Sequence, residues 1–149
     1  MYILLINNKK NFLTCGNILS KITLNNKFFF LLGNLGIGKT TLIKSIAGSM
    51  TKYKINMSSP SYKIIEQYTY IKKIYHIDFF KVNNIKNLTE IDFFDYQKQN
   101  AFFFIEWGDK IKIKNFIPDI RIYIFHYSNF SNRLIIIKSK FLNLKKIFG

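Results

Sequence analysis

The chain has 149 residues, 48% of them hydrophobic, and a formal net charge of +15. This length suits one domain with a substantial core, and no apolar run is long enough to span a bilayer, so no membrane partner is expected. The single cysteine, Cys15, excludes an internal disulfide and a cysteine-based metal cage, which makes a reducing cytoplasm the expected location.

The basic charge raises the question of a nucleic-acid partner. Lysine and arginine together number 23, but only Arg121 and Arg133 are arginine, and the lysines are scattered in ones and twos. Isoleucine, lysine, phenylalanine and asparagine share A/T-rich codons and dominate the composition, so a drift of the genome toward A and T accounts for the lysines. We favour a solvated basic surface over a dedicated nucleic-acid face, and a weak, salt-sensitive affinity for RNA stays open.

The N-terminal part of the chain predicts a strand, a helix and a second strand. Tyr2–Ile6 is a short apolar strand. Apolar residues then recur at helical spacing over Phe12–Ile22, with Asn11 as the expected N-cap. Phe28–Leu32 is a continuous apolar run, which is typical of a buried parallel strand.

The next stretch, Gly33–Thr41, fits the phosphate-binding loop pattern G-x-x-x-x-G-K-[ST], with Gly33 and Gly38 as its fixed glycines. A loop that wraps a polyphosphate must turn its backbone N–H groups inward, which requires dihedral angles that glycine adopts at little cost. Lys39 supplies a point charge for the β- and γ-phosphates, and the hydroxyl of Thr40 is a candidate Mg²⁺ ligand.

A helix is expected directly after this loop. Thr41–Ala47 places its apolar residues on one helical face, and Gly48 is predicted to end the helix. Strand, glycine loop and helix form the arrangement that phosphate binding needs, because the helix N-terminus then points at the phosphates. This context favours nucleotide binding over a glycine-rich turn with an incidental lysine.

The middle of the chain holds a candidate switch and a buried acid. Ser59–Tyr62 combines proline with serine hydroxyls, so it is either a switch near the γ-phosphate or an ordinary loop. Tyr62–Tyr70 and Ile71–Phe80 predict two strands, as a hairpin. Asp78 lies inside the second apolar stretch, where a carboxylate is costly unless it is paired, caps an element or lies near a metal.

A helix over Ile85–Gln99 and a strand from Ala101 are expected next. The strand ends in the acid Glu106, followed by Trp107. A buried strand that delivers a carboxylate beside the phosphate loop is the second signature of a phosphate-loop NTPase, since the acid can hold Mg²⁺ or polarise the attacking water. The alternative is a strand-end glutamate that is exposed to solvent.

The C-terminal third predicts a second hairpin. Ile120–Tyr127 and Leu134–Ile137 are its strands, and a short amphipathic helix is expected over Phe141–Gly149. The whole pattern predicts an α/β phosphate-loop NTPase fold with three layers and a central mixed sheet, as a single domain over residues 1–149.

The absence of three motifs argues against several classes of phosphate-loop NTPase. The chain has no Asn-Lys-x-Asp motif of the kind with which GTPases read their base, and no signature loop of transporter ATPases. Small-molecule kinases clamp phosphates with several lid arginines, whereas both arginines here come late. A minimal ATPase that a partner completes is favoured; a small-molecule kinase, or a basic tRNA-binding module with a vestigial ATP site, stays an alternative.

Four elements in this order and spacing resemble the TsaE (YjeE) family, the bacterial ATPases of tRNA threonylcarbamoyladenosine biosynthesis. They are Gly33–Thr41, Ser59–Tyr62, Tyr75–Lys81 and Ile105–Trp107. The resemblance implies ATP and Mg²⁺ as ligands. It also implies action on the TsaB–TsaD pair, which modifies adenosine 37 of tRNAs reading ANN codons, so that tRNA is met indirectly through that complex.

The resemblance also assigns roles position by position. It implies that Lys39, Asp78 and Glu106 are catalytic residues and that Thr40 and Glu106 lie beside the metal ion. The implied nucleotide-binding residues are Gly33, Gly36, Ile37, Gly38, Lys39, Thr40, Thr41 and Asn132. The family commonly has Asp, Thr, Tyr and Arg where this chain has Asn34, Ser61, Phe80 and Lys81. Lysine at position 81 keeps the charge without the bidentate fork of arginine.

Overall fold

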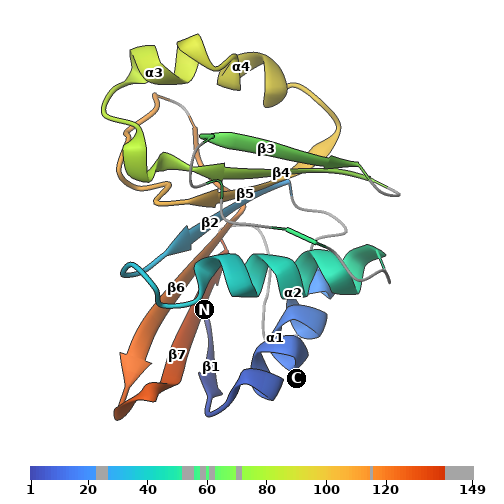
Figure 1. The fold of residues 1–149 in the computed structure, drawn as a ribbon, viewed down its shortest axis with the longest axis vertical. Coiled ribbons are helices and arrows are strands. Elements are labelled where there is room, and N and C mark those ends of the chain that lie inside the picture. The colour runs from blue at the N-terminus through green and yellow to red at the C-terminus, as the bar shows by residue number, and fades with distance from the viewer. Residues whose placement is uncertain are drawn as a thin grey trace.

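A computed structural model of the protein gives an α/β fold built on one sheet (Figure 1). The structure describes residues 1–22, 27–51, 56–57, 60, 63–69, 72–114 and 116–139, without the side chains of residues 9, 10 and 129–131. In chain order the elements are β1 (Tyr2–Ile6), α1 (Lys9–Ile22), β2 (Phe28–Leu32), α2 (Lys39–Thr51), β3 (Ile65–Thr69), β4 (Lys73–Asp78), α3 (Ile85–Glu90), α4 (Phe93–Tyr96), β5 (Ala101–Glu106), β6 (Ile120–Tyr127) and β7 (Asn129–Ser139).

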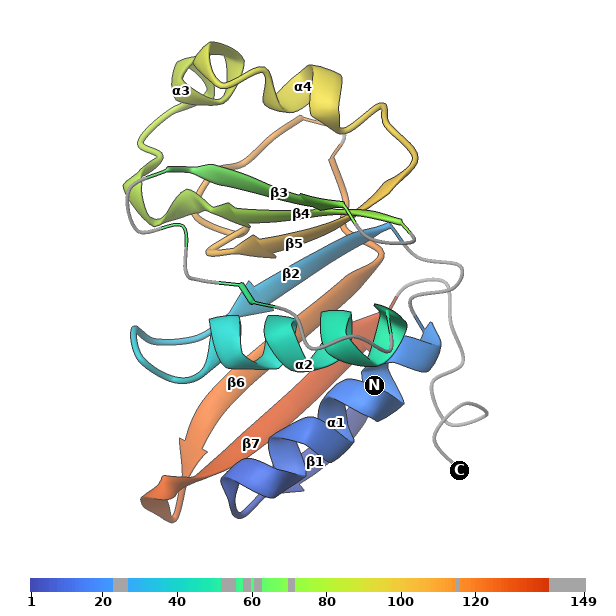
Figure 2. The same cartoon turned by 45° about the vertical axis from the view of Figure 1, so that its right-hand side comes forward.

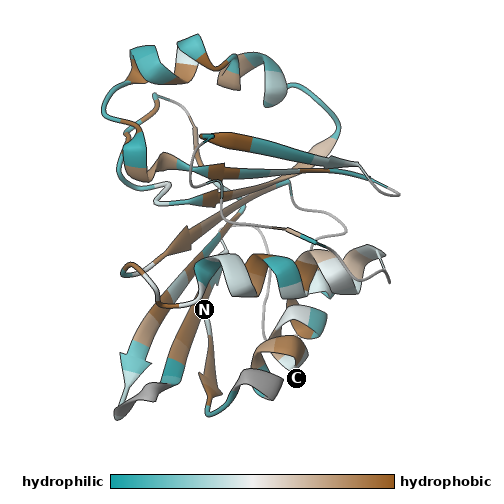
Figure 3. Ribbon diagram, viewed as in Figure 1, coloured by the Kyte–Doolittle hydropathy of each residue, from teal (hydrophilic) through white to brown (hydrophobic). Residues whose placement is uncertain are grey.

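In the part of the chain that the structure describes, seven strands form a mixed sheet in the order β1-β7-β6-β2-β5-β4-β3. Strand β2 is parallel to both β5 and β6, and β4 is parallel to β5. The pairs β1–β7, β6–β7 and β3–β4 are antiparallel. Strand β2 and the part of β5 before Glu106 are continuous apolar runs, as the hydrophobic colouring of the inner strands shows (Figure 3). Both faces of the sheet are covered there.

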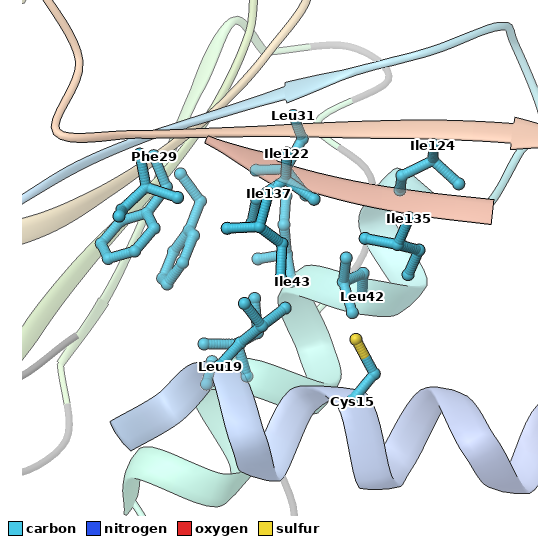
Figure 4. Packing of buried hydrophobic residues seen from close by; sticks show 14 of the residues in the cluster. Cys15, Leu19, Phe29, Leu31, Leu42, Ile43, Ile122, Ile124, Ile135 and Ile137 are labelled. Atoms are coloured by element: carbon cyan, nitrogen blue, oxygen red, sulfur yellow. The ribbon is translucent and has the colours of Figure 1, made fainter. Parts of the chain in front are cut away.

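Helices α1 and α2 pack side by side against one face of the sheet (Figure 2). The helical spacing of their apolar residues turns one side of each helix toward the strands. In Figure 4 the side chains of both helices meet those of the sheet: Cys15, Leu19, Leu42 and Ile43 from the helices, and Phe29, Leu31, Ile122, Ile124, Ile135 and Ile137 from the strands. Each large apolar side chain buried here contributes about 1.5–3 kcal/mol relative to exposure.

The opposite face is covered by α3, α4 and the segment after β5, over the β2–β5–β4–β3 half of the sheet (Figure 1). Side chains alternate between the two faces of a strand, so the residues next to those that face α1 and α2 point toward α3 and α4. Leu88 of α3 and Phe93 of α4 are fully buried against Phe103 and Ile105 of β5. The predicted three layers around a central mixed sheet are therefore confirmed.

Both helices beside the phosphate loop begin or end elsewhere than expected. Helix α1 starts at Lys9, and the side chain of Asn8 accepts a hydrogen bond from the backbone N–H of Asn11 at 3.0 Å, so Asn8 takes the capping place predicted for Asn11. Helix α2 runs through Gly48 to Thr51. Because the buried face of α2 continues past Gly48 to Thr51, packing outweighs the weak helix propensity of glycine.

The helix expected over 85–99 is instead two short helices. Asp92 between them has a φ of 54°, in the left-handed region, which turns the chain so that Leu88 and Phe93 both reach the core. Strand β7 is longer than expected and begins at Asn129, directly after a turn at Ser128 with a φ of 62°. The predicted helix over Phe141–Gly149 lies outside the described residues.

Candidate functional site

The phosphate loop connects the end of β2 to the start of α2, as predicted. Gly33 has a φ of 149°, and a Cβ there would lie 2.5 Å from the carbonyl oxygen of Ile124 on β6. Gly38 has a φ of 111°, and a Cβ there would lie 3.1 Å from the ring of Phe12. Both fixed glycines are therefore required by the backbone angle and by the close approach of neighbours.

Lys39, at the first position of α2, is 4% exposed and folds back into the loop. Its Nζ donates to the carbonyl oxygens of Gly33 at 2.9 Å and Asn34 at 3.0 Å. The same ammonium group lies 4.3 Å from the ring centroid of Trp107 and 4.0 Å from Oε2 of Glu106. The positive charge is thus held at the mouth of the loop, where the N-terminal N–H groups of α2 add to it.

Glu106, the last residue of β5, lies at the heart of the site. Strands β4 and β5 are parallel and in register here, so that Asp78 is the partner of Glu106 at the same edge of the sheet. Oε1 of Glu106 accepts a hydrogen bond from Oγ1 of Thr40 at 2.6 Å and lies 2.9 Å from Nε2 of His76. The predicted pairing of this acid with the phosphate loop is present as a direct side-chain contact, and Glu106 is only 4% exposed.

Burial of Glu106 by itself raises the pKa of its carboxyl group. Hydrogen bonds from His76 and Thr40, helped by the charge of Lys39, outweigh burial and hold this pKa below its ordinary value. Glu106 is therefore an ionised acceptor at neutral pH. Burial also lowers the pKa of Lys39, against the opposing effect of Glu106.

Asp78 has the opposite shift. Burial raises the pKa of its carboxyl group, the backbone N–H of Phe80 partly offsets this, and the nearby charge of Glu106 adds to the rise. Its Oδ1 accepts from that N–H at 2.9 Å and caps a 3₁₀ turn over Phe79–Lys81. Two carboxyl groups at neighbouring strand ends thus have their pKa values pushed apart, which is typical of sites that separate the roles of two acids.

A cleft of about 240 Å³ opens over this cluster. It is lined by Leu35, Gly36, Gly38, Lys39, Thr40, Thr41, Asp78, Glu106 and Trp107. Trp107 has a φ of 59°, and its ring lies 5.3 Å from that of Phe80, so the turn after β5 builds an aromatic wall. A second cavity of about 210 Å³ shares Leu35 and Asp78 with the first.

The donor set fits a magnesium ion. The proton of the Thr40 hydroxyl is used by Glu106, which leaves oxygen lone pairs on Thr40 for a cation. Among the described residues no three His, Cys, Asp or Glu side chains are grouped to hold a metal. Mg²⁺ suits such a site, because it is commonly bound by one or two carboxylates together with substrate phosphates and water.

Two further predicted residues, Asn132 and Pro60 of the candidate switch, do not line this cleft. Asn132 lies on β7, and its carbonyl oxygen accepts from Nη1 of Arg133 at 3.1 Å; it is not among the residues that line the cleft. Of the candidate switch Ser59–Tyr62, only Pro60 lies within the described residues; it is buried and lines the second cavity.

Two contacts of the site were not predicted from the sequence. His76 forms a hydrogen bond with Glu106, whereas in the sequence it stands out only as one residue of the Tyr75–Lys81 motif. Arg133 donates from Nε to the carbonyl oxygen of Ile37 at 3.0 Å and so supports the loop from β7. The alternation of His76 with Asp78 along β4 places both on one face and was the available signal for the first contact; no local pattern marks the second.

The sheet order, the glycine loop before α2 and the acid at the end of β5 define a phosphate-loop α/β protein. A family model described as threonylcarbamoyl adenosine biosynthesis protein TsaE matches residues 6–135. The chain therefore belongs to the TsaE family, and the resemblance seen in the sequence is confirmed.

Individual relatives agree with this family. The chain is 33% identical over 82 residues to the tRNA threonylcarbamoyladenosine biosynthesis protein TsaE of Haemophilus influenzae, covering 54% of this chain and 51% of that protein. It is 27% identical over 110 residues to the same-named protein of Rickettsia felis, covering 73% and 64%. It is also 27% identical over 108 residues to that of Rickettsia prowazekii, covering 72% and 74%. The first of these matches thus spans about half the length of the relative.

A solved structure shares the fold. The crystal structure of YdiB from Bacillus subtilus matches with a TM-score of 0.71 over 99% of this chain and 90% of that one, at 19% sequence identity. In the described part of the chain, no helix is long and apolar enough to cross a membrane.

Proposed function

We propose that this protein binds and slowly hydrolyses Mg-ATP as an accessory factor in the threonylcarbamoylation of adenosine 37 in tRNAs reading ANN codons, acting on the TsaB–TsaD pair. The observation that carries the proposal is the hydrogen bond between Thr40 of the loop and Glu106 of β5. It joins the phosphate cradle to an ionised acid in the way that a nucleotide-hydrolysing site requires. Membership of the TsaE family supplies the pathway.

Each residue has a distinct part in this proposal. Lys39 moves from the loop carbonyls to the β- and γ-phosphates, where its charge offsets theirs. Thr40 and Glu106 would hold a magnesium ion, which would supply charge neutralisation at the phosphates. Asp78, with its raised pKa, lines the same cleft beside Glu106 and is the candidate second acid.

The phosphates themselves are held by backbone. The backbone N–H groups of the loop after Gly36 and of the first turn of α2 are the proposed donors to phosphate oxygens, whereas that of Ile37 donates to the carbonyl oxygen of Asn34 at 3.3 Å. Gly33 and Ile37 shape the loop, the latter through its contact with Arg133. Asn132 stays a predicted nucleotide contact.

Dependence on a partner follows from how little surrounds the cleft. Apart from the cradle, the described residues offer one aromatic wall and no arginine among those that line the site. Slow hydrolysis alone and faster hydrolysis with TsaB–TsaD are expected, with tRNA met only through that complex. We further propose a single domain over residues 1–149 and a cytoplasmic location.

Phosphate release from Mg-ATP tests this function. The protein is measured alone and with added TsaB–TsaD, beside Glu106→Gln. We expect slow release alone, stimulation by the pair, and a loss of 100-fold or so in the variant. Release unaffected by the pair would reject the accessory role. Phosphate transfer to a metabolite without the pair would favour a kinase, and tRNA binding indifferent to ATP would favour a nucleic-acid module.

A further inference from the structure

His76 lies on β4 in the core beneath the cleft and is 0% exposed. Its neighbour across the sheet is Phe104, two residues before Glu106, so the imidazole and the carboxylate share a face of adjoining strands. Nε2 lies 2.9 Å from Oε1 of Glu106. Since Glu106 is an ionised acceptor, this nitrogen carries the proton and donates.

The other ring nitrogen is unsatisfied. Of the buried side-chain nitrogen and oxygen atoms of the described residues, Nδ1 of His76 is the one without a hydrogen-bond partner. A buried polar atom without a hydrogen-bond partner destabilises the fold, and an apolar side chain would avoid that cost. The imidazole at this position is therefore better explained by its contact with Glu106 than by core packing.

Two donors from separate elements converge on one carboxylate oxygen. Thr40 approaches Oε1 from the start of α2, and His76 approaches it from β4. A carboxylate held by one bond can rotate about that bond, whereas two donors at Oε1 fix the plane of the group. Oε2 is thereby directed toward Lys39, 4.0 Å away.

We propose that His76 is a positioning residue that holds Glu106 in its productive orientation through an Nε2–H hydrogen bond. This inference rests on the proposed hydrolysis and names a residue that acts on the reaction through Glu106 alone. It places a proton on Nε2, the ring nitrogen that lies 2.9 Å from Oε1 of Glu106.

The first test compares His76→Leu with His76→Gln, whose amide N–H occupies the place of Nε2–H. ATP hydrolysis is measured with TsaB–TsaD present, and kcat is separated from KM. We expect His76→Leu to lower kcat 10- to 100-fold, as loss of a supporting contact does elsewhere, with KM changed less than threefold. His76→Gln should recover most of the loss. Equal activity of the wild type and His76→Leu would overturn the proposal, and so would a glutamine variant no better than leucine.

Tyr75→Phe is the matched control. Tyr75 lies on the same strand, points to the opposite face and bonds Gln67 and Gln99 through its hydroxyl. This variant disturbs a buried polar group of β4 without touching Glu106, and its kcat should match the wild type. A loss in the control equal to that in His76→Leu would mean that general damage to β4 is responsible, and would overturn the positioning role.

A measurement on the unchanged protein keeps the proposal testable even where a variant does not fold. Nitrogen-15 NMR of the His76 ring should show a proton on Nε2, the nitrogen that faces Glu106; an Nε2 without a proton would overturn the proposal. The failure of the proposed function has a different signature: wild-type protein with the TsaB–TsaD pair would then release no more phosphate than Glu106→Gln.

Discussion

Lys39 and Glu106 show how single side chains are prepared for a nucleotide before one is bound. Lys39 is held by two loop carbonyls, a ring face and a carboxylate, all within reach of its Nζ. The two hydrogen bonds go to neutral carbonyl oxygens and the carboxylate lies 4.0 Å away, so a charged phosphate oxygen would be a stronger acceptor for this ammonium group. Substitution of either residue is therefore expected to have a large effect on nucleotide binding or hydrolysis.

Replacing the loop lysine tests the cradle directly. Lys39→Ala removes the charge meant for the β- and γ-phosphates, and should weaken Mg-ATP binding by about 10- to 100-fold, the loss expected for charged hydrogen bonds. Calorimetric titration measures the affinity. Lys44→Ala, exposed on the same helix, is the control and should bind as the wild type does. Unchanged Mg-ATP affinity of Lys39→Ala would contradict the assignment of this loop as the phosphate-binding site.

Asp78→Asn should stabilise the protein without nucleotide while it lowers hydrolysis. The raised pKa of Asp78 means that its charged form is disfavoured in the folded state. As the pH falls through that pKa, the folded protein takes up a proton before the unfolded chain does, and the free energy of unfolding rises. Asparagine keeps the oxygen that caps Phe80 and removes the charge. The gain, about 0.5–1 kcal/mol, should be largest at neutral pH and shrink toward about pH 4.

Urea unfolding of both proteins across this pH range measures the difference. A gain that grows on acidification would contradict the sign of the shift.

Sequence reasoning named Asp78 from the cost of an acid in an apolar run. It could not show that the carboxyl caps a turn, because the cap is set by the backbone conformation of Phe79–Lys81.

The two helices of one face approach each other closely at Gly16. A Cβ built on Gly16 of α1 would lie 2.0 Å from Oγ of Ser45 and 2.6 Å from its backbone carbon on α2. Gly16→Ala must therefore separate the helices, and should destabilise the protein by about 1–3 kcal/mol. Asn17→Ala, exposed on the same helix, is the control and should change stability by less than about 0.5 kcal/mol. Thermal unfolding of both compares them; an unaffected Gly16→Ala would contradict this packing.

Cys15 reports on the same interface without any substitution. It is 2% exposed, and burial raises the pKa of its thiol to about 12. The thiolate is the reactive form, so a thiol reagent should modify the native protein at least 100-fold more slowly than the urea-unfolded chain. Labelling followed by mass spectrometry measures the two rates. Fast labelling of the native protein would show that α1 opens from the sheet.

At the element scale, the sequence predicted strands better than helix ends. Phe28–Leu32 and Ala101–Glu106 were found because both faces of these strands are buried, which leaves a continuous apolar run. The ends of α1 and α2, and the break at Asp92, depend on a cap from Asn8 and on which side chains reach the core. These helix ends are set by tertiary contacts, and local helix propensity does not predict them.

The whole molecule is organised so that chemistry meets at one edge of the sheet. The parallel strands β2, β5 and β4 all end there, and they bring the loop, Glu106 and Asp78 together from positions far apart in the chain. The carboxyl ends of neighbouring parallel strands share an edge. The sequence predicted that the strand ending in Glu106 lies beside the phosphate loop, and it left the place of Asp78 open because that depends on the order of the strands in the sheet. The contacts of His76 and Arg133 with the site come from register and from β7, which the sequence alone does not specify.

Trp107 provides a direct test of the claim that this edge binds Mg-ATP. It is the only tryptophan of the chain, and its ring lies 4.3 Å from the ammonium of Lys39. Phosphates should draw Lys39 from the ring, so titration with Mg-ATP is expected to give a saturable change in Trp107 fluorescence that AMP does not produce and that Lys39→Ala abolishes. A fluorescence signal that stays constant while calorimetry registers bound ATP, or that changes equally in Lys39→Ala, would contradict the site described for this protein.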